Sequence, residues 1–439
     1  MPHVIYLAIG FPPAAKSCSY RMKAVANAFA RRGWDVTAVS LKDAAWEWET
    51  GLDLTLLEGL SPRVVREQVD LERADLDPDI RKYSRKRALD ASGWLAEQWQ
   101  LDEDVFPERY FGRWLGPLTD ALKRVHASHP GDLLMVSPAP YVTLGAALEF
   151  CEGSDIPLAV DYRDGWSIDV IGGEEAFPPG SRAGVIERSV LQRASRAWFV
   201  NDAIKGFYSE RFPDLRQRFR VVRNGYDSMS PPVIELRKPG PLRFGYLGNL
   251  SSKPPQVESL LKSWRIARLG SPLLADSTFE FLGHVGTQSS GMNANKRLIA
   301  QFGADGVSYG GPVAKGDVAA SYRSWDVLVF PLIGGPYMTS GKVYEYMATG
   351  LPIASAHDPA NGASEVLRDY PLWARNESLD PGDVAEALIT AAEMVRCAPE
   401  QRVAARRHAE TFERRRLTDP ALADLIGTIP QAPRSAVRP

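Results

Sequence analysis

The chain has 439 residues, of which 44% are hydrophobic, and its formal net charge at pH 7 is −2. Single cores stop growing below this length, so we expect two domains, and the near-neutral charge gives no footprint for nucleic acid. Cys18, Cys151 and Cys397 fit no C-x-x-C spacing, which favours a reducing cytoplasm, and no apolar stretch reaches the roughly 18 residues that span a bilayer.

The first half of the chain alternates short apolar runs with helical patterns. The apolar run 4–11 predicts a strand, 19–33 an amphipathic helix and 35–41 a second strand. This βαβ rhythm is typical of a parallel, doubly wound sheet. Further strands are expected at 132–137, 156–162, 196–201 and 219–224.

The same rhythm restarts after a segment with four prolines, 228–241, which we take as the domain boundary. The second series of strands is expected at 242–250, 278–284, 306–311, 327–332 and 352–356. The fold class is therefore α/β, with two doubly wound domains and a cleft between them. The predicted boundaries are 1–232, with a helical insertion at about 60–128, then 238–415, then a terminal helix and a disordered tail over 416–439.

A glycine-rich segment late in the second series, residues 334–355, contains Ser-Gly-Lys. Five residues separate Gly335 from Gly341, and Val343 follows Lys342 where a P-loop needs Ser or Thr. The segment therefore fails the P-loop pattern, and ATP hydrolysis is a poor interpretation.

Residues 339–341 of that segment nevertheless predict the start of a helix. Residues 339–341 precede a helical pattern, and unpaired N–H groups at such a start attract anions. Lys342 adds positive charge, and Glu345 lies one turn in, where it could accept hydrogen bonds from ribose hydroxyls. The alternative is an ordinary capped helix that ends at Gly350 and Pro352.

Three ionisable residues end the strand at 156–162, namely Asp161, Arg163 and Asp164. Ligands of parallel sheets bind at this edge, and Arg163 could meet an anionic group in bidentate fashion. The alternative is an internal Arg–Asp pair that fixes the turn. We expect Trp166 to be a packing residue rather than a platform for a sugar.

A basic run at 81–87, RKYSRKR, is followed by Trp94 and Trp99. A basic helix with aromatic residues can lie on an anionic membrane surface. Peripheral membrane contact through 81–99, at the inner face of the membrane, is therefore one interpretation. A solvated helix face with packed aromatic residues is the other.

Several segments, in order along the chain, resemble retaining glycosyltransferases of family 4 (glycosyl transferases group 1). These enzymes have the GT-B fold of two Rossmann-like domains that face across a cleft. The segments are GFPP (10–13), DYRDGW (161–166), NGYD (224–227), YLGNLSSK (246–253), YGGPVAKGDVAASYRSWDVLVFPL (309–332) and SGKVYEYMATGLPIA (340–354).

The resemblance implies roles in binding a nucleotide diphosphate sugar as co-substrate. Glu345 would bind the ribose, and Thr339, Ser340, Gly341 and Lys342 would present N–H groups and charge to the diphosphate. Tyr337 stands where the family has the first Glu of its E-x7-E motif, which contacts the transferred sugar. The donor sugar contacts are therefore open.

The resemblance also assigns the remaining site residues. Gly248 and Asn249 replace the family's Gly-Arg, and Lys253 occupies the position of its diphosphate lysine; Lys342 could compensate for the missing arginine. Gly10 and Lys16 belong to the loop that touches phosphate or acceptor. The catalytic candidates are Asp161, Arg163, Asp164 and Lys253. Ser137 stands near a position where many members carry histidine, and a polar contact there falls to Ser137, Asp161 or Asp164.

The function expected from this resemblance is retaining hexosyl transfer to a glycan or lipid-linked acceptor in envelope or exopolysaccharide synthesis. The first domain would bind the acceptor. Neutralisation of the leaving diphosphate by N–H groups and lysines is the expected main catalytic effect, and no metal is needed. Two alternatives stay open, a nucleotide-sugar epimerase of the same fold and a non-catalytic sugar-nucleotide binding protein.

Overall fold

The computed structural model describes the chain except at residues 48, 72, 78, 228–239, 251–252, 286–291, 333, 397–398 and 430–439. Most of the expected linker, Cys397 and the tail expected to be disordered lie outside the described residues. The chain divides into two compact units. Unit 1 comprises residues 1–169, 174–223 and 417 onward, and unit 2 comprises residues 170–173 and 224–416.

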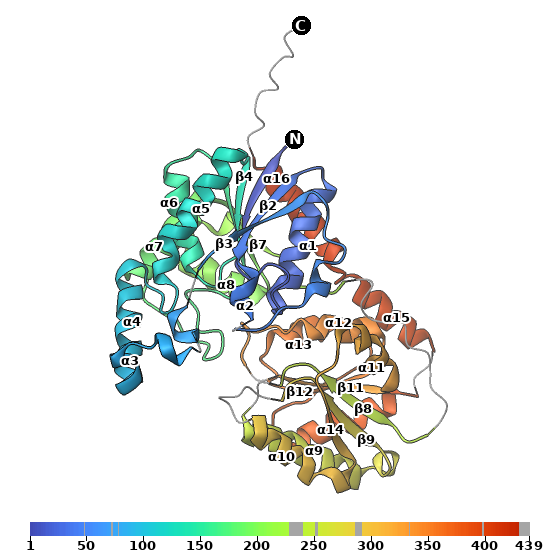
Figure 1. Cartoon of the computed structure of the whole chain (residues 1–439). Coiled ribbons are helices and arrows are strands. Elements are labelled where there is room, and N and C mark those ends of the chain that lie inside the picture. The colour runs from blue at the N-terminus through green and yellow to red at the C-terminus, as the bar shows by residue number, and fades with distance from the viewer. Residues whose placement is uncertain are drawn as a thin grey trace. The chain divides into compact units, whose positions relative to one another are not determined.

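The described residues of unit 1 form a seven-stranded parallel sheet in the order β3-β2-β1-β4-β5-β6-β7. Figure 1 labels β2, β3, β4 and β7 of this sheet, together with the helices that connect its strands. The central strands β1, β4 and β5 are short apolar runs that are buried along their whole length, as is typical of a parallel sheet. The strands are β1 (His3–Leu7), β2 (Asp35–Leu41), β3 (Val64–Val69), β4 (Leu133–Val136), β5 (Leu158–Tyr162), β6 (Ala194–Phe199) and β7 (Phe219–Val221).

The helices of unit 1 connect these strands. They are α1 (Ser17–Arg31), α2 (Asp43–Trp46), α3 (Arg85–Leu89), α4 (Ala91–Val105), α5 (Leu115–Ser128), α6 (Val142–Glu152), α7 (Arg182–Arg193) and α8 (Asp202–Arg211). Short 3₁₀ turns occur at η1 (Leu54–Leu57), η2 (Ala74–Leu76), η3 (Ile80–Lys82), η4 (Gly112–Trp114) and η5 (Arg216–Arg218).

The helical insertion is shorter than predicted. Residues 64–69 form β3, which pairs in parallel with β2, and α5 lies against β1, β2 and β3. The inserted elements therefore run only from η2 to η4. The strand was missed because β3 is the outermost strand of the sheet, and its middle residues, VREQ, are only partly covered.

The described residues of unit 2 form a six-stranded parallel sheet in the order β10-β9-β8-β11-β12-β13. Its strands are β8 (Arg243–Leu247), β9 (Thr278–Leu282), β10 (Val307–Gly311), β11 (Val327–Leu332), β12 (Ile353–His357) and β13 (Trp373–Ala374). Its helices are α9 (Pro254–Gly270), α10 (Met292–Gln301), α11 (Val318–Ser324), α12 (Lys342–Thr349), α13 (Gly362–Leu367), α14 (Pro381–Met394) and α15 (Pro399–Glu410), with 3₁₀ turns η6 (Pro272–Leu274), η7 (Gly303–Asp305) and η8 (Lys315–Asp317).

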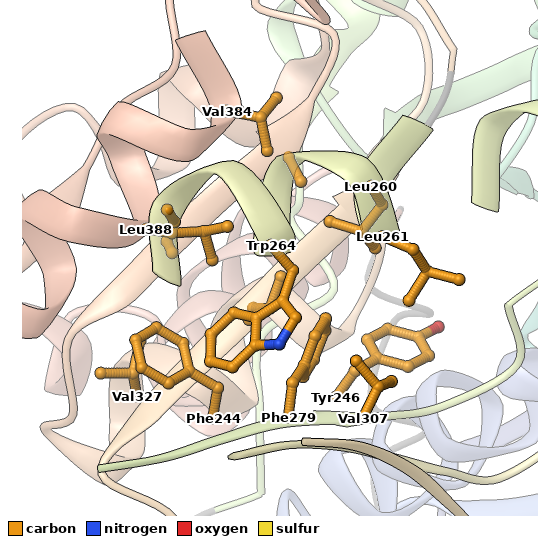
Figure 2. Packing of buried hydrophobic residues seen from close by; sticks show 14 of the residues in the cluster. Phe244, Tyr246, Leu260, Leu261, Trp264, Phe279, Val307, Val327, Val384 and Leu388 are labelled. Atoms are coloured by element: carbon orange, nitrogen blue, oxygen red, sulfur yellow. The ribbon is translucent and has the colours of Figure 1, made fainter. Parts of the chain in front are cut away.

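An aromatic and aliphatic core holds α9 and α14 on one face of this sheet. Trp264 of α9 packs on Phe244 and Phe279, at ring-centroid distances of 4.9 and 5.5 Å, and Leu388 of α14 lies beside them (Figure 2). Burial of such large side chains stabilises the fold by roughly 1.5–3 kcal/mol each. This core therefore holds the two helices on the sheet.

In each sheet there is one place where the direction of the strand order reverses. In unit 1 the chain starts at β1, moves out to β3 and returns to β4 on the other side of β1, and β8 and β11 flank the same reversal in unit 2. Ligands of open α/β sheets bind at the carboxyl ends of the strands at this point. The loop after β8, which begins at Gly248, lies there in unit 2.

The last described helix, α16 (Arg414–Ile426), returns the chain to unit 1 at Leu417. Leu422 and Leu425 are fully buried in the same core cluster as Ala159 and Trp198. The terminal helix predicted after residue 416 is therefore present, and it completes the core of unit 1.

Candidate functional site

Three glycine-containing loops meet at the carboxyl edge of the unit 2 sheet. The N–H of Gly248 donates to the carbonyl of Leu282 (3.0 Å), and that of Gly283 donates to Gly311 (2.7 Å). Gly283 has φ +102°, and a Cβ there would lie 2.1 Å from the carbonyl oxygen of Gly248. Only glycine fits at this position, because the backbones of the two loops approach each other so closely.

Helix α12 begins beside this edge. A Cβ on Gly248 would lie 3.3 Å from Cε of Lys342, the first residue of α12. The hydroxyl of Tyr346 accepts from the N–H of Leu247 (3.1 Å), which ties α12 to the end of β8. The predicted residues Gly248 and Lys342 are thus brought together although 94 positions separate them in the sequence.

The start of α12 is open and its end is capped. Gly341 is exposed, and the Ser340 hydroxyl accepts from the N–H of Lys342 at 3.3 Å. Thr339 is half-buried beside Gly362, where a Cβ would lie 2.5 Å from its Oγ1. The helix ends at Gly350 with φ +72°, as predicted. The helix start therefore remains accessible to an anion.

Glu345 lies in the first turn of α12, and its side chain is 33% exposed. Its Oε2 accepts from the hydroxyl of Tyr322 (3.0 Å) and from Nζ of Lys342 (3.2 Å). Among the described residues, no hydrogen bond or ion pair involves Oε1. The carboxylate is thus held through one oxygen, which leaves the other to meet a ligand.

Tyr322 holds Glu345 from the interior. The ring is 1% exposed, and burial, together with the charge of Glu345, raises the pKa of its phenol well above the ordinary value. Tyr322 therefore stays a hydrogen-bond donor at every ordinary pH. Tyr322 could not be predicted from the sequence, because nothing in its local pattern shows that α11 places its ring against α12.

The remaining residues predicted for the nucleotide lie around this edge. Asn249 is exposed directly after Gly248, and Lys253 is exposed at the start of α9, where the side chain of Gln256 accepts from its N–H at 2.8 Å. Tyr337 is half-buried in the loop between β11 and α12. These residues belong to the loops that follow β8 and β11, as the motif positions imply.

In unit 1 the predicted catalytic residue Asp161 is fully buried. Nε of Arg21 lies 3.0 and 2.9 Å from its two carboxylate oxygens, and Arg21 is 4% exposed. Nη1 of Arg21 also donates to the carbonyl of Val222 (2.8 Å). The pair ties α1, β5 and the end of β7 together, so the structure favours the internal Arg–Asp alternative, with Arg21 as the partner.

Arg163 and Asp164 lie nearer the surface. Their side chains are 23% and 42% exposed, and Nη2 of Arg163 lies 3.6 Å from Oδ2 of Asp164. Trp166 is stacked between Phe106 and Tyr141, at centroid distances of 5.3 and 5.4 Å. The prediction that Trp166 packs rather than presents a sugar platform is confirmed.

The loop after β1 contains the other predicted residues of unit 1. The carbonyl of Gly10 accepts from the hydroxyl of Ser19 at 2.7 Å. Nζ of Lys16 donates to Oε1 of Glu49 at 2.7 Å and lies 4.6 Å from the ring centroid of Trp46. Lys16 is thus held by a carboxylate rather than extended toward a phosphate.

A buried carboxylate that the sequence analysis missed supports the loop after β5. Glu187 of α7 accepts from the hydroxyls of Tyr208 (2.5 Å), Tyr162 (3.2 Å) and Ser167. Burial raises its pKa to about 7, although the three hydroxyls act in the opposite direction. Ser137 is also buried, and its hydroxyl lies 3.4 Å from the carbonyl of Asp161.

The basic run at 81–87 is largely paired with carboxylates. Arg81 bonds Asp79 at 2.8 Å, Lys82 lies 3.3 Å from Asp77 and Lys86 bonds Glu97 at 2.8 Å. Membrane contact of this segment stays a prediction. Within the described part of the chain, no helix combines the length and hydropathy that a membrane crossing requires, and no group of three or more His, Cys, Asp or Glu side chains could hold a metal ion.

Comparison with known proteins identifies the fold. Residues 241–395 match the family model "Glycosyl transferases group 1". No curated protein is similar enough in sequence to match the chain. The paired parallel sheets are those of the GT-B fold, two Rossmann-like domains, as predicted.

Three solved structures illustrate this likeness. A glycosyltransferase from Rickettsia africae ESF-5 is 11% identical (TM-score 0.70; 98% of this chain and 99% of that chain covered). Sucrose-phosphate synthase from Thermosynechococcus elongatus is 14% identical (TM-score 0.67; 97% and 98%). Anabaena Alr3699/HepE, solved in complex with UDP, is also 14% identical (TM-score 0.64; 97% and 100%).

Proposed function

We propose that the chain is a glycosyltransferase whose unit 2 binds a nucleoside diphosphate sugar. One observation carries the proposal, namely that Glu345 lies in the first turn of α12 and is held by Tyr322 and by Lys342, whose side chain approaches Gly248. The family match over 241–395 and the UDP complex of a protein with the same fold support it.

In this proposal the parts of the site have separate tasks. Oε1 of Glu345 accepts from a ribose hydroxyl, while Tyr322 keeps the carboxylate in place. The diphosphate lies at the start of α12, where N–H groups and the helix dipole favour negative charge. Lys342, whose Nζ lies 3.2 Å from Oε2 of Glu345, shares its charge with the diphosphate, and Lys253 and the exposed Asn249 lie on the neighbouring loop.

The reaction moves one sugar. The bond from C1 to the diphosphate oxygen breaks, a bond from C1 to the acceptor hydroxyl oxygen forms, and the hydroxyl proton passes to the departing diphosphate. Because charge develops on the leaving group, its neutralisation by the helix start and lysines is the main catalytic effect. We further propose family 4 chemistry, in which configuration is retained and these protein cations make a metal unnecessary.

In this proposal unit 1 binds the acceptor. Arg163 and Asp164 are exposed enough to contact an acceptor, whereas Asp161 acts as a structural partner of Arg21. The acceptor is a glycan or lipid-linked sugar of envelope or exopolysaccharide synthesis. We therefore propose that the enzyme acts at the cytoplasmic face of the membrane and that it is a hexosyltransferase.

The test is a thermal-shift panel of nucleotide sugars, with UDP-glucose first. At a ligand concentration of 100 times Kd we expect stabilisation by about 2.7 kcal/mol, seen as a higher Tm for one base and sugar. No shift with any nucleoside diphosphate sugar or free nucleotide would contradict the proposal.

A second measurement separates an enzyme from a binding protein. Tyr337 replaces the acidic residue that the resemblance assigns to the donor sugar, and this keeps a non-catalytic role open. Slow release of nucleoside diphosphate from the stabilising donor indicates a transferase. Binding without any release indicates a binding protein.

A further inference from the structure

Unit 1 contains a cavity of about 640 Å³ that none of the predicted roles explains. It lies where β2 and β3 end, at Leu41 and Leu71, and the inserted segment closes its other side with Arg87 and Trp94. This volume falls in the range of roughly 300–1,000 Å³ that is typical of small-molecule sites. We propose that the cavity binds a neutral oligosaccharide, and, on the basis of the proposed function, that this is the acceptor.

The apolar part of the lining suits the C–H face of a sugar ring. Trp94 is half-buried and Trp114 is buried, and Leu41, Leu71 and Leu76 lie among them. Aromatic rings offer large, rigid apolar area at low entropic cost, and indole N–H groups can still donate to hydroxyls. A sugar needs both kinds of contact.

The charged part of the lining is balanced. Lys42 pairs with Asp70, Lys82 lies 3.3 Å from Asp77, and Arg81 bonds Asp79 at 2.8 Å. The lining contains five Lys and Arg residues and four Asp and Glu residues. A phosphate or another anion would find little unpaired positive charge here, whereas paired carboxylates and guanidinium groups keep further acceptors and donors for hydroxyls.

Arg87 links several parts of the cavity rim. The guanidinium of Arg87 lies 3.7 Å from the ring centroid of Tyr83 and 4.5 Å from that of Trp94. Its Nη2 also donates to the carbonyls of Asp75 and Asp77, each at 3.2 Å. A binding surface that is already ordered loses less entropy on association.

The cavity also borders the loop after β1. Glu49 lines it and accepts from Lys16 at 2.7 Å. Lys16, predicted to touch phosphate or acceptor, therefore contributes here by holding a carboxylate of the lining.

The experiment compares glycan binding by three forms of the full chain on a panel of immobilised neutral and acidic oligosaccharides. Ala44→Phe fills the cavity from an exposed lining position and removes no polar contact. Ala91→Phe is the matched control, because Ala91 is exposed at the start of α4 and does not line the cavity. Trp94→Leu, which removes the aromatic face without filling the space, is a second variant if Ala44→Phe does not fold.

We expect the wild type and Ala91→Phe to retain a neutral glycan, and Ala44→Phe to bind it at least about tenfold more weakly. Binding should change little with added salt, because an uncharged ligand is not screened. The proposal is overturned if the wild type binds no neutral glycan, if both cavity variants bind as the wild type does, or if only phosphorylated or acidic glycans bind in a salt-dependent way.

Nucleotide-sugar binding, measured on the same three forms, tests the two proposals separately. We expect the Tm shift with the donor to be the same in all three, since Ala44 and Ala91 belong to unit 1. Loss of glycan binding in Ala44→Phe together with no donor binding in any form would support the carbohydrate site and contradict the glycosyltransferase.

Discussion

Two carboxylates that the sequence placed in the site, Asp161 and Glu345, have opposite surroundings. Asp161 has no exposed surface, and Arg21 contacts both of its oxygens. Glu345 is one-third exposed, and Tyr322 and Lys342 both contact the same one of its oxygens. The first carboxylate is therefore structural, and the second is free to bind.

The comparison shows that position at a sheet edge does not make an acidic residue part of a site. Both residues follow the order of family motifs, and Asp161 ends a strand where ligands bind. The two carboxylates differ in the groups that contact them. A guanidinium that satisfies both oxygens neutralises a buried charge, whereas a tyrosine hydroxyl and a lysine on one oxygen only orient the carboxylate.

The largest expected effect comes from removal of Arg21. Arg21→Ala leaves Asp161 buried without a counter-charge, so we expect the free energy of unfolding to fall by about 3–5 kcal/mol, measured by urea denaturation. The control is Arg63→Ala, which breaks the partly exposed pair with Asp35 and should cost less than about 1 kcal/mol. Equal losses in the two variants would show that Asp161 is not the structural carboxylate described here.

Glu187 sharpens the comparison, because it is a buried carboxylate held by three hydroxyl groups rather than by a guanidinium. Its pKa is raised from 4.5 to about 7, so the folded state binds the proton more tightly than the unfolded state does. The contribution to stability is present below pH 4.5 and is lost as the pH rises through 7, by about 3 kcal/mol in total.

Glu187→Gln should therefore flatten the decline of the unfolding free energy between pH 4.5 and 7, measured by denaturation at several pH values. Glu210→Gln, at an exposed position on α8, is the control and should leave the decline unchanged. An identical pH profile in Glu187→Gln and the wild type would count against a buried, protonatable Glu187.

For Glu345 the expected loss is in binding rather than in folding. Glu345→Gln replaces the charged carboxylate that would accept a hydrogen bond from a ribose hydroxyl. The Kd of the donor nucleotide, measured by calorimetry, should therefore rise about 10- to 100-fold. The control Glu386→Gln alters an exposed glutamate of α14 in the same unit. A different outcome would contradict this role: Glu345→Gln could lower the stability of unit 2 and yet leave the Kd unchanged at a low temperature where the variant is folded. Glu345 would then be structural, like Asp161.

The smallest effect is expected at Tyr322, which acts through Glu345. Tyr322→Phe should raise the KM of the donor about 3- to 10-fold and leave kcat within about twofold, because one hydrogen bond contributes about 1 kcal/mol. Tyr370→Phe removes another buried hydroxyl, which donates to the carbonyl of Leu351 at 2.8 Å. If the two variants behave alike, Tyr322 has no positioning role.

The parallel sheets were predictable because each buried strand is a short apolar run. The strands at 35–41 and 327–332 were predicted to the residue. β3 was missed because an edge strand needs no continuous apolar run, and β13 because it has only two residues. Buried strands and edge strands therefore differ in how much of their structure the local sequence shows.

The candidate site was predictable only where one segment carries it. Lys342 and Glu345 belong to a single helical turn, so their proximity follows from the spacing. The partner of Asp161 lies 140 positions away, and Tyr322 lies on another helix. The cavity in unit 1 is lined from three separated segments, and the sequence gives no measure of the space between them.

The return of α16 to unit 1 affects the order in which the protein can fold during translation. Ribosomes release a chain from its amino end, yet Leu422 and Leu425 belong to the core cluster that β1 and β4 share. Unit 1 must therefore wait, with part of its apolar surface uncovered, until nearly the whole polypeptide has emerged, whereas unit 2 can complete its own core earlier. A chain that ends at residue 416, which contains all of unit 2 but lacks Leu422 and Leu425, should accordingly be cut readily by proteases in its first half and resist them in its second.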